Sequence, residues 1–252
     1  MEIVIKCPCC ESTYLVKNGF SHSRKQNRIC KDCSRQFLEN SQDHFITEEE
    51  KSLIRRLLLE RLSYAAICRV ANVSYNWLLR FAEKEYKIAP ENLNIVLPKS
   101  NDFSKEFKLE ICEGDELWSF VGNRKDQNKI VWVWLIMHVE TRQIMSMYCG
   151  DRTAHSAEKL WNNLPEEIRN NGFFYTDYCK SYLSILPKDR HEAVGKDSGL
   201  TNNIEGFNCI LRQRVGRLVR ETLSFSRKFA NHVGAIKYFI CHHNLMVNST
   251  YT

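Results

Sequence analysis

The chain has 252 residues, of which 43% are hydrophobic and 26% are charged, and its formal net charge is +6. This length allows one large domain or two to three small ones, and the composition is that of an ordinary globular protein. No run of about 18 apolar residues is present, which argues against a membrane-spanning helix, and the first residues lack the apolar core of a signal peptide. We therefore expect a cytoplasmic protein.

Charge is distributed unevenly along the chain. Residues 1–100 carry 16 Lys and Arg and 12 Asp and Glu, residues 101–205 carry 13 and 17, and residues 206–252 carry 7 and 1. An acidic middle between basic ends suits an enzyme that holds a metal centrally and binds a polyanion at its flanks. An ordinary solvated surface has similar runs of charge, so this pattern alone does not decide.

Cysteines dominate the first part of the chain. The chain has 11 cysteines, and without a secretion signal these favour metal ligands and buried thiols over a disulfide framework. Two Cys-x2-Cys pairs separated by 19 residues have the spacing of a tetrahedral site with four thiolate ligands. The sequence predicts a zinc ribbon over residues 1–42 with one structural Zn²⁺, bound by Cys7, Cys10, Cys30 and Cys33.

A helical domain is predicted over residues 43–88. Thr47 and Glu50 form a capping box at the start of its first helix, and a tight turn precedes its third. Three short helices with a tight turn between the last two resemble a DNA-binding helix-turn-helix, although a generic three-helix bundle has the same pattern. On the first interpretation, the residues that face the major groove are Ser74, Tyr75, Asn76 and Arg80.

After a predicted linker over residues 89–104, the last domain, residues 105–252, begins with an unusual strand. Residues 110–121 contain many β-forming residues, but Glu113, Asp115 and Glu116 lie in the middle. Burying a carboxylate costs several kcal/mol unless a cation or hydrogen bonds compensate. Either this is an exposed edge strand with solvated acids, or Asp115 holds a divalent metal. Neighbouring strand residues point to opposite faces, so Glu116 is not expected to share the site of Asp115.

The order of the following elements predicts the fold class. Strands are expected at residues 130–137, 143–149 and 172–176, with a helix at 156–163, a short strand near 191–194 and a long helix from about 203. This is the order of a ribonuclease H-like α/β fold, in which helices flank a mixed sheet. That architecture places an acid of the first strand beside one at the end of the fourth, and a later helix supplies a third. Here the three would be Asp115, Asp177 and Glu205.

The long helix supplies further candidates. Asn202 and Glu205 have the spacing of a capping box, so Glu205 is either a cap or a metal ligand. A basic series follows it and is a plausible track for DNA phosphates. The DNA-contact residues predicted here are Asn208, Arg212, Arg214, Arg217 and Arg220. Residues 225–244 are expected to form an amphipathic helix with no metal at the His242–His243 pair. His232 is expected on the surface of this helix, with a contact to phosphate as the alternative.

Taken together, these features resemble the transposases of the insertion sequence one family over nearly the whole chain. The motifs that carry the resemblance are the Cys7-Pro8-x-Cys10 and Cys30-x2-Cys33 ribbon, the helix-turn-helix, Asp115-Glu116-Leu117-Trp118, Thr176-Asp177, Thr201-Asn202-Asn203-Ile204-Glu205-x2-Asn208, and Leu218-Val219-Arg220 with Ser224-Phe225-Ser226. This chain departs from the family pattern at Gly206-Phe207, where a basic pair is more usual, and at the extra Cys9.

The resemblance implies a DNA transposase. Asp115, Asp177 and Glu205 would form an Asp-Asp-Glu triad that binds two Mg²⁺ or Mn²⁺ ions, while the zinc ribbon and helix-turn-helix would bind terminal inverted repeats. The implied partners are double-stranded DNA, both repeat and target, and a second copy in a homodimer or larger assembly, with no membrane and a nucleoid-associated location. The alternatives are a catalytically inactive, sequence-specific DNA-binding regulator of transposition and a metal nuclease or resolvase of similar fold.

Overall fold

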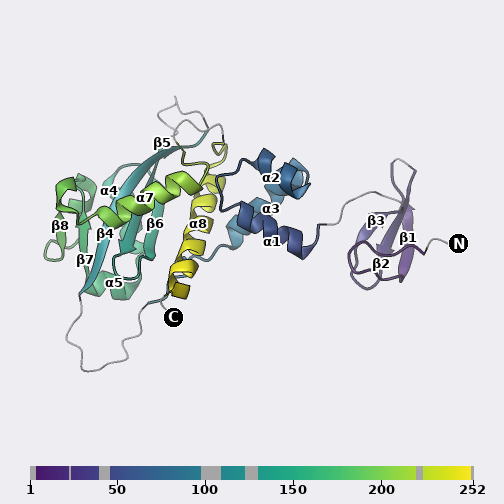
Figure 1. The fold of residues 1–252 in the computed structure, drawn as a ribbon, viewed down its shortest axis with the longest axis horizontal. Coiled ribbons are helices and arrows are strands. Elements are labelled where there is room, and N and C mark those ends of the chain that lie inside the picture. Colours follow the sequence, from purple (N-terminus) through teal and green to yellow (C-terminus); the bar gives the residue numbers. More distant parts are fainter. Residues whose placement is uncertain are drawn as a thin grey trace, which may run out of the picture. The chain divides into compact units, whose positions relative to one another are not determined.

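The computed structural model describes residues 4–22, 24–39, 46–97, 109–122, 130–219 and 224–250. The chain divides into two compact units, Met1–Ser52 and Leu53–Thr252 (Figure 1). Within the described ranges, no helix combines the length and the apolar character needed to cross a membrane.

The first unit is built around a small antiparallel sheet. Its strands lie in the order β1 (Leu15–Phe20), β2 (Gln26–Cys30) and β3 (Gln36–Leu38). Tight backbone turns precede β1 and follow β2, with the Cys7 amide donating to the Ser12 carbonyl and the Cys30 amide to the Arg35 carbonyl, both at 2.8 Å. Each turn therefore carries one of the predicted cysteine pairs.

Helix α1 (Glu48–Leu57) starts with the predicted capping box. The Glu50 amide donates to the Thr47 hydroxyl at 3.2 Å, and the Thr47 amide donates to the Glu50 carboxylate at 2.8 Å. Helices α2 (Tyr64–Ala71) and α3 (Tyr75–Ile88) follow, and Ser63 and Ser74 cap them by accepting from backbone amides of the first turn. Between α2 and α3, Asn72 takes a left-handed conformation with φ of 49°. The predicted helices and turn are confirmed.

Helix α3 packs closely on the last helix, α8 (Phe229–Thr250). Ala82 and Tyr86 of α3 form a small apolar cluster with Ala235 of α8. At Gly234, an added Cβ would lie 2.7 Å from the Cβ of Tyr86. This close crossing therefore requires glycine, and it fixes α3 against α8 within the second unit.

The rest of the second unit is built around a five-stranded mixed sheet. Its strands lie in the order β6 (Ile144–Gly150), β5 (Ile130–His138), β4 (Glu110–Phe120), β7 (Gly172–Thr176) and β8 (His191–Ala193). β4, β5 and β6 are antiparallel neighbours, whereas β7 runs parallel to β4 and to β8. Because β4 pairs on both sides, the exposed-edge alternative for the acidic strand is wrong.

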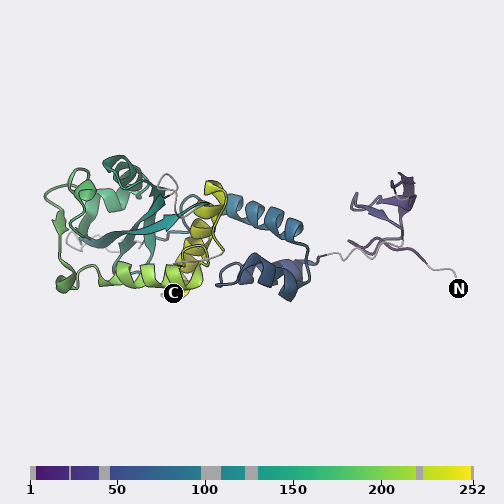
Figure 2. The ribbon, with the colours of Figure 1, turned by 90° about the horizontal axis from the view of Figure 1, so that it is seen from above.

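Helices cover both faces of this sheet. α7 (Asn202–Arg214) and α8 pack on one face, and α4 (Ala154–Asn162), α5 (Glu166–Asn171) and α6 (Lys180–Leu183) pack on the other. Figure 2 shows the sheet between the two helical layers. The predicted α/β class with a mixed sheet flanked by helices is confirmed. The short α5 and α6 and a 3₁₀ turn at Lys196–Ser198 were not expected, since so few residues give no helical periodicity.

The described part of the predicted linker, residues 89–97, is packed against the sheet domain. Ala89 and Leu93 are buried in the core beneath α8. The Val96 amide and carbonyl form a pair of hydrogen bonds with the Gln143 side chain, at 2.8 and 2.9 Å. This stretch therefore fastens the helical region to the sheet; residues 98–104 of the predicted linker lie outside the described residues.

His232 lies in the core of the second unit and not on its surface, contrary to expectation. Its exposed fraction is 0%, and neither ring nitrogen has a hydrogen-bond partner among the described residues. Burial lowers the pKa of His232 to about 4, and the neighbouring Arg217 charge acts in the same direction. The histidine is therefore neutral in the folded chain at physiological pH.

A neutral buried histidine predicts acid sensitivity. Below pH 6.5 the unfolded chain binds a proton at His232, whereas the folded chain does not until about pH 4, so stability is lost as the pH falls through this window. Over this interval we expect a loss of the order of 3 kcal/mol in the free energy of unfolding. His232→Leu should remove this loss in denaturant titrations at pH 7 and pH 4.5, whereas replacing the exposed His155 with Gln should not. An equal acid response in wild type and His232→Leu would contradict the prediction.

Candidate active site

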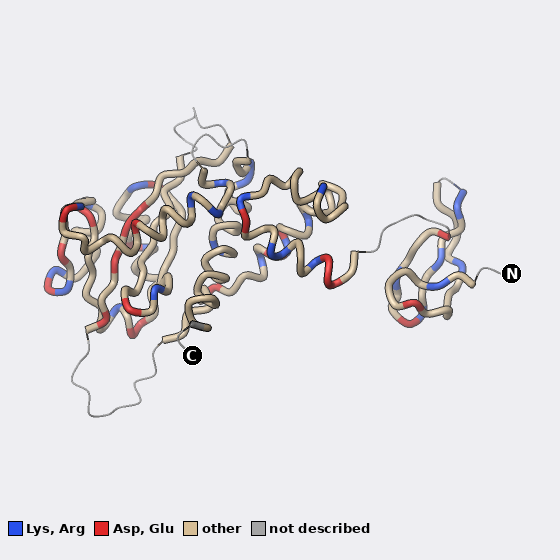
Figure 3. Tube along the Cα trace, viewed as in Figure 1, with Lys and Arg blue, Asp and Glu red and all other residues tan. Residues whose placement is uncertain are grey.

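Three carboxylates at the middle of β4 have three different sets of partners. Glu113 and Asp115 face helix α7, whereas Glu116 faces the other layer and pairs with Arg152, which follows β6. The pleat of a strand imposes this alternation. Acidic residues, red in Figure 3, thus lie within the central strand of the sheet. The negative charge of each needs a compensating partner there.

Glu113 caps helix α7 from the neighbouring strand. Its side chain accepts from the Asn203 amide group at 2.6 Å and from the Ile204 backbone amide at 2.8 Å. Amides of a first helical turn lack partners within the helix, and a carboxylate there also matches the helix dipole. The alternative capping box of Asn202 and Glu205 is not formed, because α7 starts after Thr201 and takes no side-chain cap from it. Glu113 therefore fixes α7 against the strand that carries Asp115.

Replacing Glu113 with Gln is expected to loosen this attachment. Glutamine has the same shape but places an NH₂ group where one donor of α7 needs an acceptor, and a hydrogen bond to a charged group contributes about 1.5–3 kcal/mol. We expect a loss of this order in the free energy of unfolding and faster amide exchange over residues 203–208. Glu192→Gln, on an exposed position of β8, is the control. Unchanged exchange in α7 would show that Glu113 does not hold the helix.

Asp115 lies in β4, and Asp177 directly follows the end of the neighbouring strand β7. Gly114 of β4 is in register with Thr176 of β7, so the next residue along each parallel strand is an aspartate. The Asp115 carboxylate accepts from the Asn208 side chain of α7 at 2.7 Å. Burial, with the charges of Glu116 and Asp177, raises the pKa of Asp115 to about 7, against the opposing hydrogen bond from Asn208. The two aspartates therefore interact electrostatically.

Glu205 lies on α7, one turn before Asn208. Its carboxylate accepts from the Thr201 hydroxyl at 3.0 Å. Among the described residues, only two sets of three or more potential metal ligands have atoms within 4.8 Å of one another: the four ribbon cysteines, and Glu116 with Asp177 and Cys179. The structure thus does not bring Glu205 into one such set with Asp115 and Asp177. The role of Glu205 as third ligand stays a prediction.

Glu116 lies closer to the predicted site than expected. It faces away from Asp115, as the pleat requires, and its carboxylate pairs with Arg152 at 2.6 Å. Asp177, however, lies just beyond the end of β7, where the pleat no longer sets the side-chain direction, and its carboxylate comes within 4.8 Å of Glu116. Burial and the Asp177 charge raise the pKa of Glu116, whereas Arg152 and the Cys179 side chain lower it. The sequence shows the acid but not that it neighbours Asp177.

This acid cluster fits the divalent metal that the resemblance implies. Two buried side-chain oxygens beside the aspartates, Glu116 Oε2 and Asn208 Oδ1, have no hydrogen-bond partner among the described residues. Burial, together with nearby negative charge, raises the pKa of both Asp115 and Glu116, so a bound cation would favour their ionised forms. Carboxylate oxygens in this arrangement suit Mg²⁺ or Mn²⁺.

The ribbon cysteines form the second candidate metal site. The Sγ atoms of Cys7 and Cys33 are 3.6 Å apart, as are those of Cys10 and Cys30. Tetrahedral Zn²⁺ with bonds of about 2.3 Å separates its sulfur ligands by roughly 3.8 Å. The extra Cys9 lies outside this set, and its amide donates to the Cys7 sulfur at 3.4 Å. The grouping of the four predicted cysteines is confirmed, and their spacing fits zinc.

The residues predicted to face the major groove surround the start of α3. Ser74, Tyr75, Asn76 and Arg80 are all exposed. Ser74 also caps α3, since its hydroxyl accepts from the Trp77 amide at 3.3 Å. This surface is therefore open to a partner, and the assignment of its residues to DNA contacts stays a prediction.

In the described part of the predicted phosphate track, the side chains contact other residues of the protein. Arg212 donates to the carbonyls of Trp118 and Leu218 at 3.1 and 3.2 Å, and Arg214 pairs with Glu60 at 2.6 Å. A DNA contact by either residue would have to replace these partners. Asn208 is likewise occupied by Asp115, and Arg220 lies outside the described residues.

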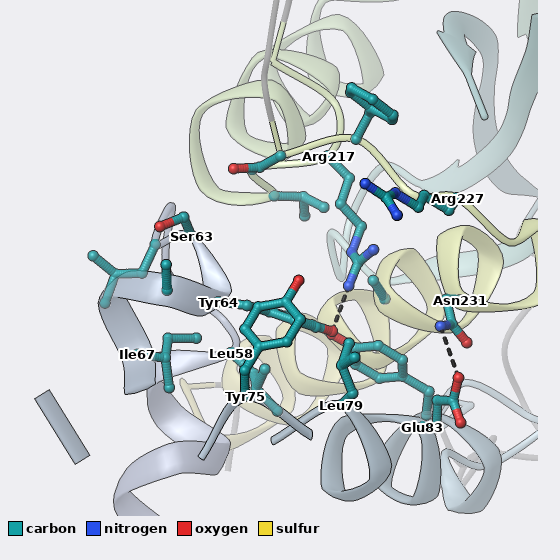
Figure 4. Close-up of a pocket in the computed structure, with 18 of the residues that line it drawn as sticks. Leu58, Ser63, Tyr64, Ile67, Tyr75, Leu79, Glu83, Arg217, Arg227 and Asn231 are labelled. Carbon is teal, nitrogen blue, oxygen red and sulfur yellow. Dashed lines mark hydrogen bonds between the residues drawn. The ribbon is translucent and has the colours of Figure 1, made fainter. Parts of the chain in front are cut away.

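Arg217 is half-buried where α2 and α3 meet the segment that follows α7. Its guanidinium lies 4.9 Å from the ring centre of Tyr64 and 5.8 Å from that of Tyr86, and it donates to the Tyr64 hydroxyl and to Ser226. Figure 4 shows it pointing into a cavity of about 530 Å³ between these parts. Its observed contacts are those of a packing residue, which the arginine pattern alone did not reveal.

Comparison with known proteins adds an independent observation. Residues 109–246, which include the whole sheet and α7, match the family model described as IS1 transposase. Insertion element iso-IS1n protein InsB of Shigella dysenteriae is 37% identical over 133 residues, which cover 53% of this chain and 95% of that protein. Insertion element IS1 protein InsB of Shigella flexneri is 30% identical over 132 residues, which cover 52% and 94%.

One solved structure, a simian T-cell lymphotropic virus intasome in complex with PP2A regulatory subunit B56 gamma, aligns with a TM-score of 0.36 and 12% identity. The alignment covers 74% of this chain and 66% of that chain.

Proposed function

The chain belongs to the IS1 transposase family, and from that premise we propose that it cuts DNA at the ends of its insertion sequence and joins those ends to a target. Membership of this family implies DNA binding and the use of a divalent metal. The observation that supports the proposed chemistry is the register of β4 with β7, which pairs Gly114 with Thr176, the residues just before Asp115 and Asp177. Burial and nearby negative charge raise the pKa of Asp115 to about 7, and a bound cation would favour its ionised form.

Asp115 and Asp177 would hold the metal, with Glu205 as the third acid of the triad. Two bound Mg²⁺ or Mn²⁺ ions would supply activation of water or a DNA 3′-hydroxyl and stabilisation of the leaving oxygen. Asn208 orients the Asp115 carboxylate, and Glu113 holds the helix on which Asn208 and Glu205 lie. Thr201 restrains Glu205 outside the cluster, so Glu205 would exchange this hydrogen bond for a metal contact.

The N-terminal parts would recognise DNA. The four ribbon cysteines would hold one structural Zn²⁺, and α2 and α3 would act as a helix-turn-helix that binds the terminal inverted repeats through the exposed start of α3. Pairing two DNA ends requires a homodimer or a larger assembly. Because its proposed substrate is chromosomal DNA, the protein would act in the cytoplasm at the nucleoid.

Strand transfer with labelled terminal-repeat DNA and Mg²⁺ tests this proposal. A transposase converts the labelled end into a joined product with a second duplex. A catalytically inactive regulator would bind the repeat in a mobility-shift assay without cutting or joining, and a nuclease would release a cut end that is never joined. Either of these outcomes would overturn the proposal.

A further inference from the structure

Glu116 has one carboxylate oxygen without a partner. Both contacts from Arg152 go to the same oxygen, Oε1: Nη2 lies 2.6 Å and Nε 2.9 Å from it. The other oxygen, Oε2, is buried and accepts no hydrogen bond from the residues that the structure describes. Only 1% of the Glu116 side chain is exposed, so water does not compensate this charge, and a buried unpaired anionic oxygen is costly.

A second unpartnered group lies beside it. The Tyr182 hydroxyl is buried, has no hydrogen-bond partner in the described part of the chain, and interacts electrostatically with Glu116, Asp115 and Asp177. The Asp177 carboxylate and the Cys179 sulfur lie within 4.8 Å of Glu116. Two buried polar groups, Glu116 Oε2 and the Tyr182 hydroxyl, thus lie near one acid cluster without forming a hydrogen bond to each other.

Charge and access both favour a cation here. Asp115, Glu116 and Asp177 carry three negative charges when ionised, and Arg152 compensates one, which leaves two. A cavity of about 520 Å³ is lined by Arg152, Asp177 and Cys179, the neighbours of Glu116 in this cluster. Lys180 and Lys196 also line the cavity but are exposed, so solvent screens their charge more than that of a bound ion.

We propose that Glu116 Oε2 is a ligand of the divalent cation held by Asp177, and that Arg152 orients Glu116 by occupying its other oxygen. This inference rests on the metal site of the proposed function and adds to it an acid outside the Asp-Asp-Glu set. Oxygen ligands select Mg²⁺ or Mn²⁺, whereas a site built on the soft Cys179 sulfur would select zinc or cadmium.

Mn²⁺ binding to the zinc-loaded full chain, followed by electron paramagnetic resonance, tests the proposal. Glu116→Gln retains an oxygen for Arg152 but replaces Oε2 with an NH₂ group, and we expect it to weaken Mn²⁺ binding at least about tenfold. Asp177→Asn should weaken binding at least as much. Cys179→Ser and Glu158→Gln, which lies on an exposed position of α4, should bind Mn²⁺ as the wild type does.

The outcomes separate this inference from the proposed function. Unchanged binding in Glu116→Gln with weakened binding in Asp177→Asn would overturn the role of Glu116 and leave the metal site standing. Unchanged binding in both would overturn the metal site itself, and loss in Cys179→Ser would indicate a thiolate site and overturn the oxygen-ligand proposal.

A measurement on the wild type avoids dependence on how the variants fold. Fe²⁺ bound in place of Mg²⁺ generates hydroxyl radicals with peroxide and ascorbate, and these cut the backbone beside the ion. We expect cuts near residues 115–117, 151–153 and 177–179. Cuts near residue 205 without cuts at 151–153 would place the ion away from Glu116 and overturn the proposal.

Discussion

Asp115→Asn is expected to abolish strand joining and to leave binding of terminal-repeat DNA unchanged. Asparagine keeps the shape of the side chain and an oxygen that can accept from Asn208, but it lacks the negative charge that a divalent cation needs. A metal ion supplies several kcal/mol of transition-state stabilisation in phosphoryl transfer, and each 1.4 kcal/mol or so is a factor of ten in rate. We therefore expect the joining rate to fall by roughly 10³-fold or more.

The same labelled DNA measures both properties, joining on a denaturing gel and binding in a mobility-shift assay. Glu158→Gln, a neutralised acid on an exposed position of α4, is the matched control and should join at the wild-type rate. Because the Asp115 carboxylate is destabilised by burial, the Asn variant should also be at least as stable as the metal-free wild type. Retained joining in Asp115→Asn would remove this residue from the site.

The periodic parts of the fold follow from the sequence. The continuous apolar run that became β5 predicts a strand buried on both faces, and the acids in the preceding stretch mark β4 because hydrophobic burial does not explain them. The observed register of β4 with β7 pairs Gly114 with Thr176, the residues just before Asp115 and Asp177. The strands depend on local pattern, which is why they lie where the sequence predicts them, whereas the metal site shared by these acids stays a prediction.

Partners far apart along the chain do not follow from local pattern. Glu113 caps a helix that starts 90 residues later, and Arg152 is 36 residues from Glu116, so no local spacing indicates either pair. For a similar reason, a basic series predicted a solvated track, whereas Arg217 lies against Tyr64 and Tyr86. The sequence identifies which residues are charged, but tertiary packing decides whether each of them is buried or exposed.

The ribbon depends on its metal more than any other part of the chain does. Among residues 4–22 and 24–39, the buried side chains are those of Cys7 and Cys30, so no apolar core is present there to stabilise the three strands. Binding of structural zinc contributes about 10–16 kcal/mol in isolated zinc-finger peptides near neutral pH. The sheet of the first unit should therefore fold only when the four thiolates hold the ion.

Cys30→Ser is accordingly expected to unfold the ribbon without unfolding the sheet of the second unit. Hydrogen exchange on the full chain should show loss of amide protection over β1, β2 and β3, while protection in β4 and β5 is unchanged because they belong to a separate compact unit. A zinc chelator should have the same effect on the wild type. Cys9→Ser is the matched control, since Cys9 is exposed and outside the four-sulfur set, and it should keep full protection. Persistent protection of β1–β3 in both Cys30→Ser and the chelated wild type would show that the ribbon folds without metal, and the zinc assignment would then be wrong.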